Sequence, residues 1–234
     1  MKTTVGQYDG RLLKDIVGWD IATWKRALSV WDRLLGDVAG AKVLDIGARR
    51  GGLSLYFALK GCTVICSDLG GPSPEATTLH ERYGVADRVT YRDIDVTKIA
   101  LPDDTFDIVC FKSVLGSLDR VGGPKAHLCA VREMHRVLKP GGWLAIAENM
   151  ASSRLHAYLR RRFVPWAARW RYLTYDEVPE LLAPFRESRV IFHGFLATFG
   201  RREWQRAMLH LLDVFLVPLL PNASRYLMIG AAMK

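Results

Sequence analysis

The stretch 42–58 constrains the fold of this chain more than any other. An apolar run at 43–46 is followed by a glycine-containing turn and then by the helical pattern of residues 53–58. A strand, a glycine turn and a helix in this order direct backbone N–H groups and a helix N-terminus at a bound ligand. The turn at 47–51 reads G-A-R-R-G, so Arg49 replaces the middle glycine of the G-x-G-x-x-G dinucleotide pattern. Alone, the stretch predicts a nucleotide-type site without deciding which cofactor it takes.

The rest of the chain alternates strand and helix patterns. Strands are predicted at 42–46, 63–67, 89–94, 106–112, 143–147, 190–195 and 225–232. Helices are predicted at 8–40, 53–59, 74–83, 124–138, 154–172, 175–183 and 201–216. Continuous apolar strands such as 108–111 are typical of a parallel sheet covered on both faces. We therefore expect an α/β fold: a doubly wound, seven-stranded, mostly parallel sheet with helical insertions, whose ligand lies beyond the carboxyl ends of the strands.

We expect a single domain over 1–234. Residues 1–40 form a helical cover, 41–150 the ligand-binding core, and 151–234 the substrate-side helices and last two strands. The apolar stripe of the cover predicts packing on the sheet, and the alternative is that Trp19 and Trp24 roof the substrate pocket.

Cysteine spacing and the N-terminus indicate the compartment. The four cysteines form no C-x-x-C pair, which favours buried free thiols over a metal site or a disulfide. The first residues carry no apolar signal segment, so we expect a cytoplasmic protein. No His spacing of the H-x-x-x-H type occurs, and no metal is expected.

The positive charge is concentrated in the last third of the chain. The formal net charge is +9, with 20 Lys and Arg against 18 Asp and Glu in residues 1–150, and 13 against 6 in residues 151–234. This asymmetry indicates a charged partner or substrate at the C-terminal region.

Three later segments extend the ligand site. Asp68 ends the second predicted strand, where a carboxylate can accept both hydroxyl protons of a ribose. The stretch 95–107 reads D-V-T-K-I-A-L-P-D-D-T-F-D, and 136–144 reads R-V-L-K-P-G-G-W-L. The second of these is a helix end with a basic residue, Pro and Gly before the fifth strand.

With Asp45, Gly47 and Gly51, these segments resemble the class I S-adenosylmethionine (SAM) methyltransferases over residues 40–150. Their first motif is usually D/E-x-G-x-G-x-G, from which Arg49 departs. The resemblance implies SAM as cofactor, S-adenosylhomocysteine as product, and Asp95 and Val96 at the adenine. The cofactor-binding residues that it implies are Asp45, Gly47, Ala48, Arg49, Gly51, Asp68, Leu69, Asp95, Val96 and Lys112.

Arg49 has two interpretations. Its side chain could turn toward the SAM carboxylate or an anionic acceptor, replacing the close approach of a glycine with a charge contact. Alternatively, it points to solvent from an ordinary backbone conformation.

A general base is expected near the methyl group, which the resemblance places over the tips of strands 106–112 and 143–147. Glu148 is the first candidate for the catalytic base, with His156 and Tyr175 in reserve. The alternative is that Glu148 only hydrogen-bonds loop backbone or the cofactor.

Residues 154–172 hold six arginines interleaved with aromatic side chains. They could form a solvated basic helix face, a pocket for an anionic small molecule, or a surface for a membrane or nucleic acid. The apolar run 211–220 could be a lid, a dimer patch, an interfacial helix for a lipid-linked acceptor, or core.

These observations predict a SAM-dependent methyltransferase that modifies O or N of a small, anionic or glycosylated metabolite, which could be lipid- or sugar-linked. Peripheral membrane contact stays open, and nucleic acid is disfavoured as a partner because no RNA-binding module is visible. The alternatives are an RNA methyltransferase and a non-catalytic SAM-fold binding subunit.

Overall fold

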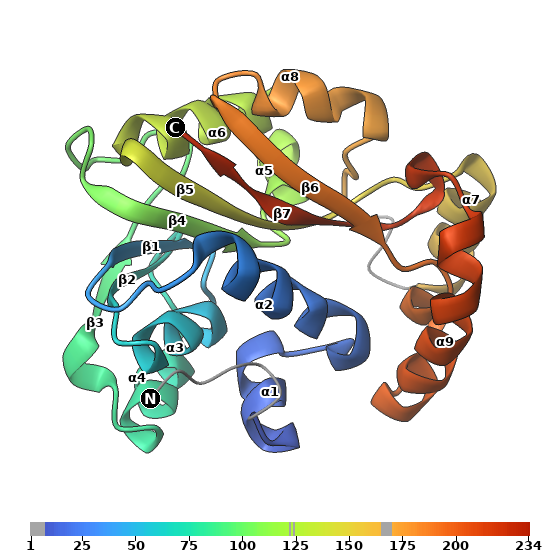
Figure 1. Ribbon diagram of the computed structural model, residues 1–234, viewed down its shortest axis with the longest axis horizontal. Coiled ribbons are helices and arrows are strands. Elements are labelled where there is room, and N and C mark those ends of the chain that lie inside the picture. The colour runs from blue at the N-terminus through green and yellow to red at the C-terminus, as the bar shows by residue number, and fades with distance from the viewer. Residues whose placement is uncertain (1–7, 122, 124, 165–169) are drawn as a thin grey trace.

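A seven-stranded sheet between two helical layers forms the body of the protein. The computed structural model describes residues 8–121, 123, 125–164 and 170–234 (Figure 1). The strand order is β3-β2-β1-β4-β5-β7-β6, and β7 runs antiparallel to both of its neighbours, β5 and β6, whereas the other described strand pairs are parallel. The strands are β1 Lys42–Ile46, β2 Thr63–Asp68, β3 Val89–Asp93, β4 Phe106–Lys112, β5 Leu138–Asn149, β6 Glu187–His193 and β7 Leu227–Met233. The predicted fold class is confirmed.

The topology places the ligand site between β1 and β4. The chain runs outward from β1 through β2 to β3 and then returns to β4 on the other side of β1. A crevice opens beyond the strand ends where the order reverses in this way. The register aligns those ends, since Ile46 is opposite both Ser67 and Phe111, and Phe111 is opposite Ile146.

One face of the sheet is covered by α1 Gly10–Val17, α2 Ile21–Leu35, α3 Gly52–Leu59 and α4 Pro74–Arg82. Trp24, Leu28 and Trp31 of α2 are buried there, and the indole N–H of Trp31 donates to the Gly230 carbonyl at 2.9 Å. The stretch 8–40 is helical as expected, but it divides into two helices. Gly18 ends the first helix by donating its N–H to the Lys14 carbonyl, and a second helix starts at Ile21.

The opposite face is covered by α5 Leu115–Val121, α6 Ala126–Val137 and α8 Val178–Leu182, the last preceded by the 3₁₀ turn Tyr175–Glu177. The sequence did not predict α5, because its short pattern is broken by Gly116. Three of the four cysteines are buried as expected, whereas Cys129 on α6 is exposed.

Two further boundaries differ from expectation. β5 begins at Leu138, so residues 139–142 belong to the strand rather than to the turn before it. Leu138 pairs with Phe106 before a register shift, which lets the strand absorb the Pro-Gly-Gly segment. The helix expected over 154–172 ends at Phe163 (α7, Arg154–Phe163), because Val164 is extended before a proline. Residues 165–169 lie outside the described part.

The helix expected over 201–216 is confirmed as α9, Glu203–Leu216. It stands with α7 at one end of the molecule, beside the carboxyl ends of β5 and β6 (Figure 1).

Candidate cofactor and acceptor site

The turn after β1 requires a glycine at position 47. Gly47 has φ +66°, and a Cβ added there would lie 2.5 Å from a methyl carbon of Val114 in the loop after β4. The glycine turn and the β4 loop are therefore packed against each other at the switch point, as close approach of backbone to a ligand requires.

Arg49 also adopts the left-handed conformation, with φ +47°. Its N–H donates to Oδ2 of Asp68 at 2.9 Å, and its carbonyl accepts the N–H of Ser73 at 2.9 Å. The expectation of an ordinary backbone conformation is therefore wrong, although the side chain is exposed. A non-glycine residue in this region costs about 1 kcal/mol.

Replacing Arg49 by glycine should raise the free energy of unfolding by about 0.5–1 kcal/mol, since glycine relieves the strain but adds entropy to the unfolded chain. Urea unfolding measures this change. The matched control is Arg50→Gly, at an exposed neighbour without positive φ, which should lose stability. A loss of stability in Arg49→Gly as well would mean that the arginine side chain makes a stabilising contact.

Carboxylates stand at the ends of β2 and just beyond β3. Asp68 accepts the N–H groups of Arg49 and Leu69, one on each oxygen, at 2.9 and 2.8 Å. Oδ1 of Asp95 accepts the N–H and the hydroxyl of Thr97 at 2.8 and 2.7 Å. These bonds orient both carboxylates, and each oxygen of a carboxylate can accept further hydrogen bonds. Val96 is buried in the core, and Leu69 is exposed.

Asp45 is buried inside β1. Its Oδ2 accepts the Ser54 hydroxyl at 2.7 Å, and its Oδ1 has no hydrogen-bond partner among the described residues. Burial raises the pKa of Asp45 to about 7, against the lowering effect of the hydrogen bonds from Ser54.

Asp45 should make stability depend on pH. Because its pKa is raised from 3.8 to about 7 in the folded protein, its contribution is fully present below pH 3.8 and is lost as the pH rises through 7. The free energy of unfolding of the wild type, relative to Asp45→Asn, should fall by about 2–3 kcal/mol between roughly pH 5 and 7.5. Urea unfolding of both proteins at the two pH values measures it, and parallel pH dependence would contradict the shift.

Lys112 ends β4 beneath two tryptophans. Its Nζ lies 4.3 Å from the ring centroid of Trp24 and 5.0 Å from that of Trp19. Burial lowers the pKa of Lys112 to about 7, while the charges of Asp20 and Glu148 oppose this shift. Residues 19–24 thus cover the tip of β4, and Trp24 packs in the core beneath the helical cover, as expected. A role of the two tryptophans in roofing a substrate pocket stays a prediction.

Glu148 is buried and commits both oxygens to backbone. Oε2 accepts the N–H groups of Val114 and Leu115, each at 2.8 Å, and Oε1 accepts that of Asn149 at 2.9 Å. Burial raises the pKa of Glu148 to about 7, and these three bonds oppose the rise. This geometry favours the alternative in which Glu148 holds the loop after β4, and its role as a base stays a prediction.

The inner face of α7 carries His156 and, four residues later, Arg160, both buried. Nε2 of His156 lies 2.8 Å from the Phe195 carbonyl, so Nε2 carries the proton and Nδ1 keeps a lone pair without a described partner. Burial lowers the pKa of His156 to about 4, with the charge of Arg160 as the second cause.

The Arg160 guanidinium is 1 % exposed and has no carboxylate beside it within the described ranges. One of its N–H groups donates to the Met150 carbonyl at 3.0 Å, whereas Nε and the second terminal nitrogen make no well-formed hydrogen bond with any described residue. Its central carbon lies 4.2 Å from the ring of Tyr172 and 5.4 Å from that of Tyr226. Burial raises the pKa of Tyr172, and the interaction of its hydroxyl with the Arg160 guanidinium opposes the rise.

The arginines of residues 154–172 thus differ in their surroundings: Arg160 is buried, whereas other described ones are exposed, as a basic helix face requires. Arg154, Arg161 and Arg162 are exposed, Arg171 is ion-paired with Glu177, and Arg169 lies outside the described residues. Tyr175 is exposed against Phe192 of β6. The signal that could have singled out Arg160 is its four-residue spacing from His156 on one helix face.

Residues 44–146 match the family described as "Methyltransferase domain". Over 115 residues, the chain is 36% identical to a ubiquinone biosynthesis O-methyltransferase of Pseudomonas syringae pv. tomato, covering 48% of this chain and 46% of the relative. Over 130 residues, it is 32% identical to a demethylmenaquinone methyltransferase of Clavibacter sepedonicus, covering 56% and 46%. The phosphoethanolamine N-methyltransferase 2 of Haemonchus contortus in complex with SAM shares the fold, with TM-score 0.65, 17% identity, and coverage of 96% of this chain and 56% of that one.

Residues 44–146 form a methyltransferase domain, and the sheet around them has the fold of the class I methyltransferases. The expected family and its cofactor, SAM, are confirmed. The chain spans about half the length of the curated relatives that it matches.

The described residues of the methyltransferase domain fit SAM. The turn at Gly47 leaves no room for a Cβ, one buried oxygen of Asp45 lacks a partner, and the carboxylates of Asp68 and Asp95 follow adjacent strands. Which of these residues touch the cofactor stays a prediction.

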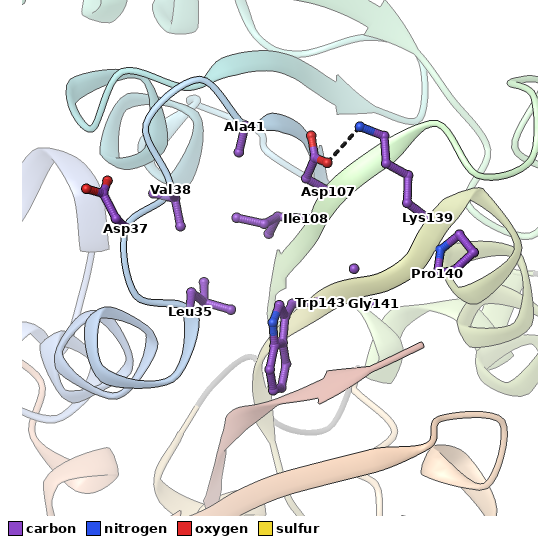
Figure 2. Close-up of a pocket in the computed structure, with 11 residues that line it drawn as sticks. Leu35, Asp37, Val38, Ala41, Asp107, Ile108, Lys139, Pro140, Gly141 and Trp143 are labelled. Atoms are coloured by element: carbon purple, nitrogen blue, oxygen red, sulfur yellow. Dashed lines mark hydrogen bonds and ion pairs between the residues drawn. The ribbon is translucent and has the colours of Figure 1, made fainter.

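A pocket of about 210 Å³ lies at the opposite end of the strands (Figure 2). It is lined by residues at the amino ends of β4 and β5, including the ion pair between Lys139 and Asp107 at 2.7 Å. In open α/β sheets ligands bind beyond the carboxyl ends of the strands, so this pocket is separate from the expected cofactor site.

Two facts bear on metal and membrane chemistry. Within the part of the chain that the structure describes, no cluster of His, Cys, Asp and Glu side chains could hold a metal ion. Across the same ranges, no helix combines the length and apolar character needed to cross a bilayer.

Proposed function

We propose that this domain transfers the methyl group of SAM to an oxygen of a small acceptor that carries an anionic group. Bound SAM supplies a methyl group on a positively charged sulfur, which is open to attack by a nucleophile. The single observation that carries the anionic acceptor is Arg160, a buried guanidinium without a carboxylate among the described residues.

A buried charge without a partner is costly, so such a group is normally paired. A carboxylate or phosphate of the acceptor would supply the missing charge and accept the unpaired N–H groups of Arg160, in the bidentate geometry that guanidinium favours. The hydroxyl of Tyr172 is available to the same ligand. A buried arginine suits a small molecule better than RNA, whose phosphates are bound mostly at solvated surfaces.

The names of the curated relatives support an oxygen acceptor, because several are O-methyltransferases of ubiquinone biosynthesis. Methylation of a hydroxyl also needs a group that takes its proton. Nδ1 of His156 is uncharged, has a free lone pair, and lies on the same helix face as Arg160. We assign Nδ1 of His156 the role of taking the hydroxyl proton. Bound SAM would supply the methyl group, with its S–CH₃ bond broken and S-adenosylhomocysteine as the leaving group.

The remaining side chains position the reactants. Glu148 holds the loop after β4 through Val114 and Leu115, and Lys112 closes the tip of that strand beneath Trp19 and Trp24. With a pKa lowered to about 7, Lys112 can lose its proton beside a cationic cofactor instead of repelling it. Holding the acceptor oxygen in line with the methyl group accounts for much of the rate in such reactions.

The test is calorimetric titration with SAM, followed by a S-adenosylhomocysteine release assay on paired acceptors. Each pair is a hydroxylated carboxylic acid or phosphate and its neutral ester. We expect SAM to bind, and turnover with acids or phosphates but not with their esters.

Other outcomes separate the alternatives. Absence of SAM binding would remove the enzyme interpretation, and binding without turnover on any acceptor would favour a non-catalytic subunit. Turnover of esters as fast as acids would remove the anionic acceptor. Salt-sensitive retention and methylation of RNA would promote the nucleic-acid alternative.

A further inference from the structure

The helix α9 turns its apolar side outward. Every exposed side chain of this helix is apolar, and the exposed fractions reach 78 % at Phe215. The exposed residues are Trp204, Ala207, Met208, Leu211, Leu212, Val214 and Phe215. Leu219, just after the helix, is 82 % exposed. Surface helices ordinarily show the reverse arrangement, with polar residues toward solvent.

Two carboxylates on the polar side of α9 accept hydrogen bonds from the rest of the protein, so the helix is held with its apolar side outward. The carboxylate of Glu203 accepts the N–H groups of Asp20 and Ile21 at 2.9 and 3.1 Å. The buried carboxylate of Asp213 accepts those of Phe195, Leu196 and Ala197 at 2.8 to 3.1 Å. Glu203 and Asp213 are ten residues apart on α9. Their hydrogen bonds fix the rotation of the helix about its axis, so that its apolar side faces solvent.

The helix α7 packs on the same segment as α9. Both helices contact residues 195–199. The Asp213 carboxylate of α9 accepts backbone N–H groups of this segment, and the His156 ring of α7 packs on Phe195 and Phe199. The outer face of α7 exposes Leu155, Tyr158 and Phe163. Figure 1 shows α7 and α9 at the same end of the molecule. We call the exposed side chains of α7 and α9, with Leu219, the α7–α9 face.

Positive charge borders this face. Arg154, Arg161 and Arg162 are exposed on α7, and Arg201 and Arg202 are exposed just before α9. On the described parts of both helices no acidic side chain is exposed, since Glu203 is half-buried and Asp213 is buried.

We propose that the α7–α9 face lies in the interface of a lipid bilayer that contains anionic lipids. Exposed leucine, phenylalanine and tryptophan side chains reach the acyl boundary from a helix lying flat, while bordering arginines bind acidic headgroups. A second copy of the chain fits less well, because a symmetric interface would bring the same arginine border against itself. At 14 residues, α9 lies on the membrane rather than across it.

This inference does not depend on the proposed methyl transfer, but it would place the acceptor site at the bilayer. α7 carries Arg160 and His156 on its inner side and the apolar residues on its outer side. An acceptor that enters from the membrane would therefore have only α7 between it and the side chains of Arg160 and His156.

The experiment is co-sedimentation of the full chain with vesicles of phosphatidylcholine, and of phosphatidylcholine mixed with phosphatidylglycerol. We expect binding to the mixed vesicles. The triple variant L211Q/L212Q/F215Q should lose at least about tenfold in partitioning, since it removes three inserted apolar side chains but keeps good helix formers. The variant R161Q/R162Q should lose about tenfold or more on the mixed vesicles and nothing on phosphatidylcholine alone.

The matched control is Ile191→Thr, at an exposed apolar side chain of β6 outside the face, which should bind vesicles like the wild type. Calorimetric titration with SAM and the melting temperature report whether each variant is folded. The proposal is overturned if the triple variant is folded and binds the mixed vesicles as strongly as the wild type. It is also overturned if the wild type does not bind vesicles, or if it forms a dimer in sedimentation that the triple variant dissolves.

Discussion

Arg160→Met is expected to abolish acceptor turnover while leaving the free protein as stable as before or more so. The substitution removes a buried guanidinium whose described neighbours include no carboxylate, and methionine fills a similar volume with an apolar chain. Replacing buried charge by well-packed apolar residues is often neutral or stabilising. Against this gain stands the lost hydrogen bond to the Met150 carbonyl, so we expect a net change of about 0 to +2 kcal/mol in the free energy of unfolding.

The effect on turnover should be much larger. Truncating one member of a buried, hydrogen-bonded charge pair costs about 2–5 kcal/mol, so kcat/KM for the acceptor should fall at least about 100-fold. The affinity for SAM should stay unchanged, because Arg160 is not among the residues expected to hold the cofactor, which lie in or just after β1, β2, β3 and β4. Steady-state kinetics with an acceptor found in the paired assay, calorimetry with SAM and urea unfolding measure the three quantities.

The control is Arg161→Met, one residue along α7, where the side chain is exposed. In assays without vesicles it should change neither stability nor turnover. If Arg160→Met lost stability and kept its turnover, the arginine would be a structural residue and the anionic acceptor would lose its main support.

The cofactor side of the domain was predictable because its signals are local. Asp45, Gly47 and Asp68 sit at the ends of strands that apolar runs mark clearly, and parallel strands bring their carboxyl ends to one edge of the sheet. A short segment around each residue therefore sufficed to place it. The positive φ at Gly47 follows from the same turn, whereas that of Arg49 does not, because an arginine gives no sign that it will adopt the left-handed conformation.

The acceptor side was predicted only in outline, because burial there is decided by tertiary packing. Six arginines in one segment look alike in sequence, yet Arg160 alone among the described ones is buried, since α7 docks that face on residues 195–199 and Tyr226. The sequence likewise did not decide whether the apolar side of α9 faces the core or the solvent. Its rotation is set by Glu203 and Asp213 binding backbone N–H groups far away in the chain.

Gly47→Ala is expected to cost about 2–4 kcal/mol of stability and at least about 100-fold in SAM affinity. Two effects add: alanine at φ +66° is strained by about 1–2 kcal/mol, and its Cβ would lie 2.5 Å from a methyl carbon of Val114. The clash forces the glycine turn and the β4 loop apart, and both border the expected cofactor site. Calorimetric titration with SAM and urea unfolding measure the two losses.

A double-mutant cycle with Val114→Ala separates the clash from the strain. Removing the two methyl groups of Val114 costs about 1–2 kcal/mol alone, but in the double variant it also removes the contact that the added Cβ would make. The double variant should therefore recover part of the SAM affinity, with a coupling energy of about 1–2 kcal/mol. Gly61→Ala provides the control for strain: its φ is +86°, but the added Cβ meets only Ala39 at 3.8 Å, so it should lose stability and keep its SAM affinity. Additive losses in the cycle would mean that the turn and the β4 loop do not touch, and that strain alone makes position 47 require glycine.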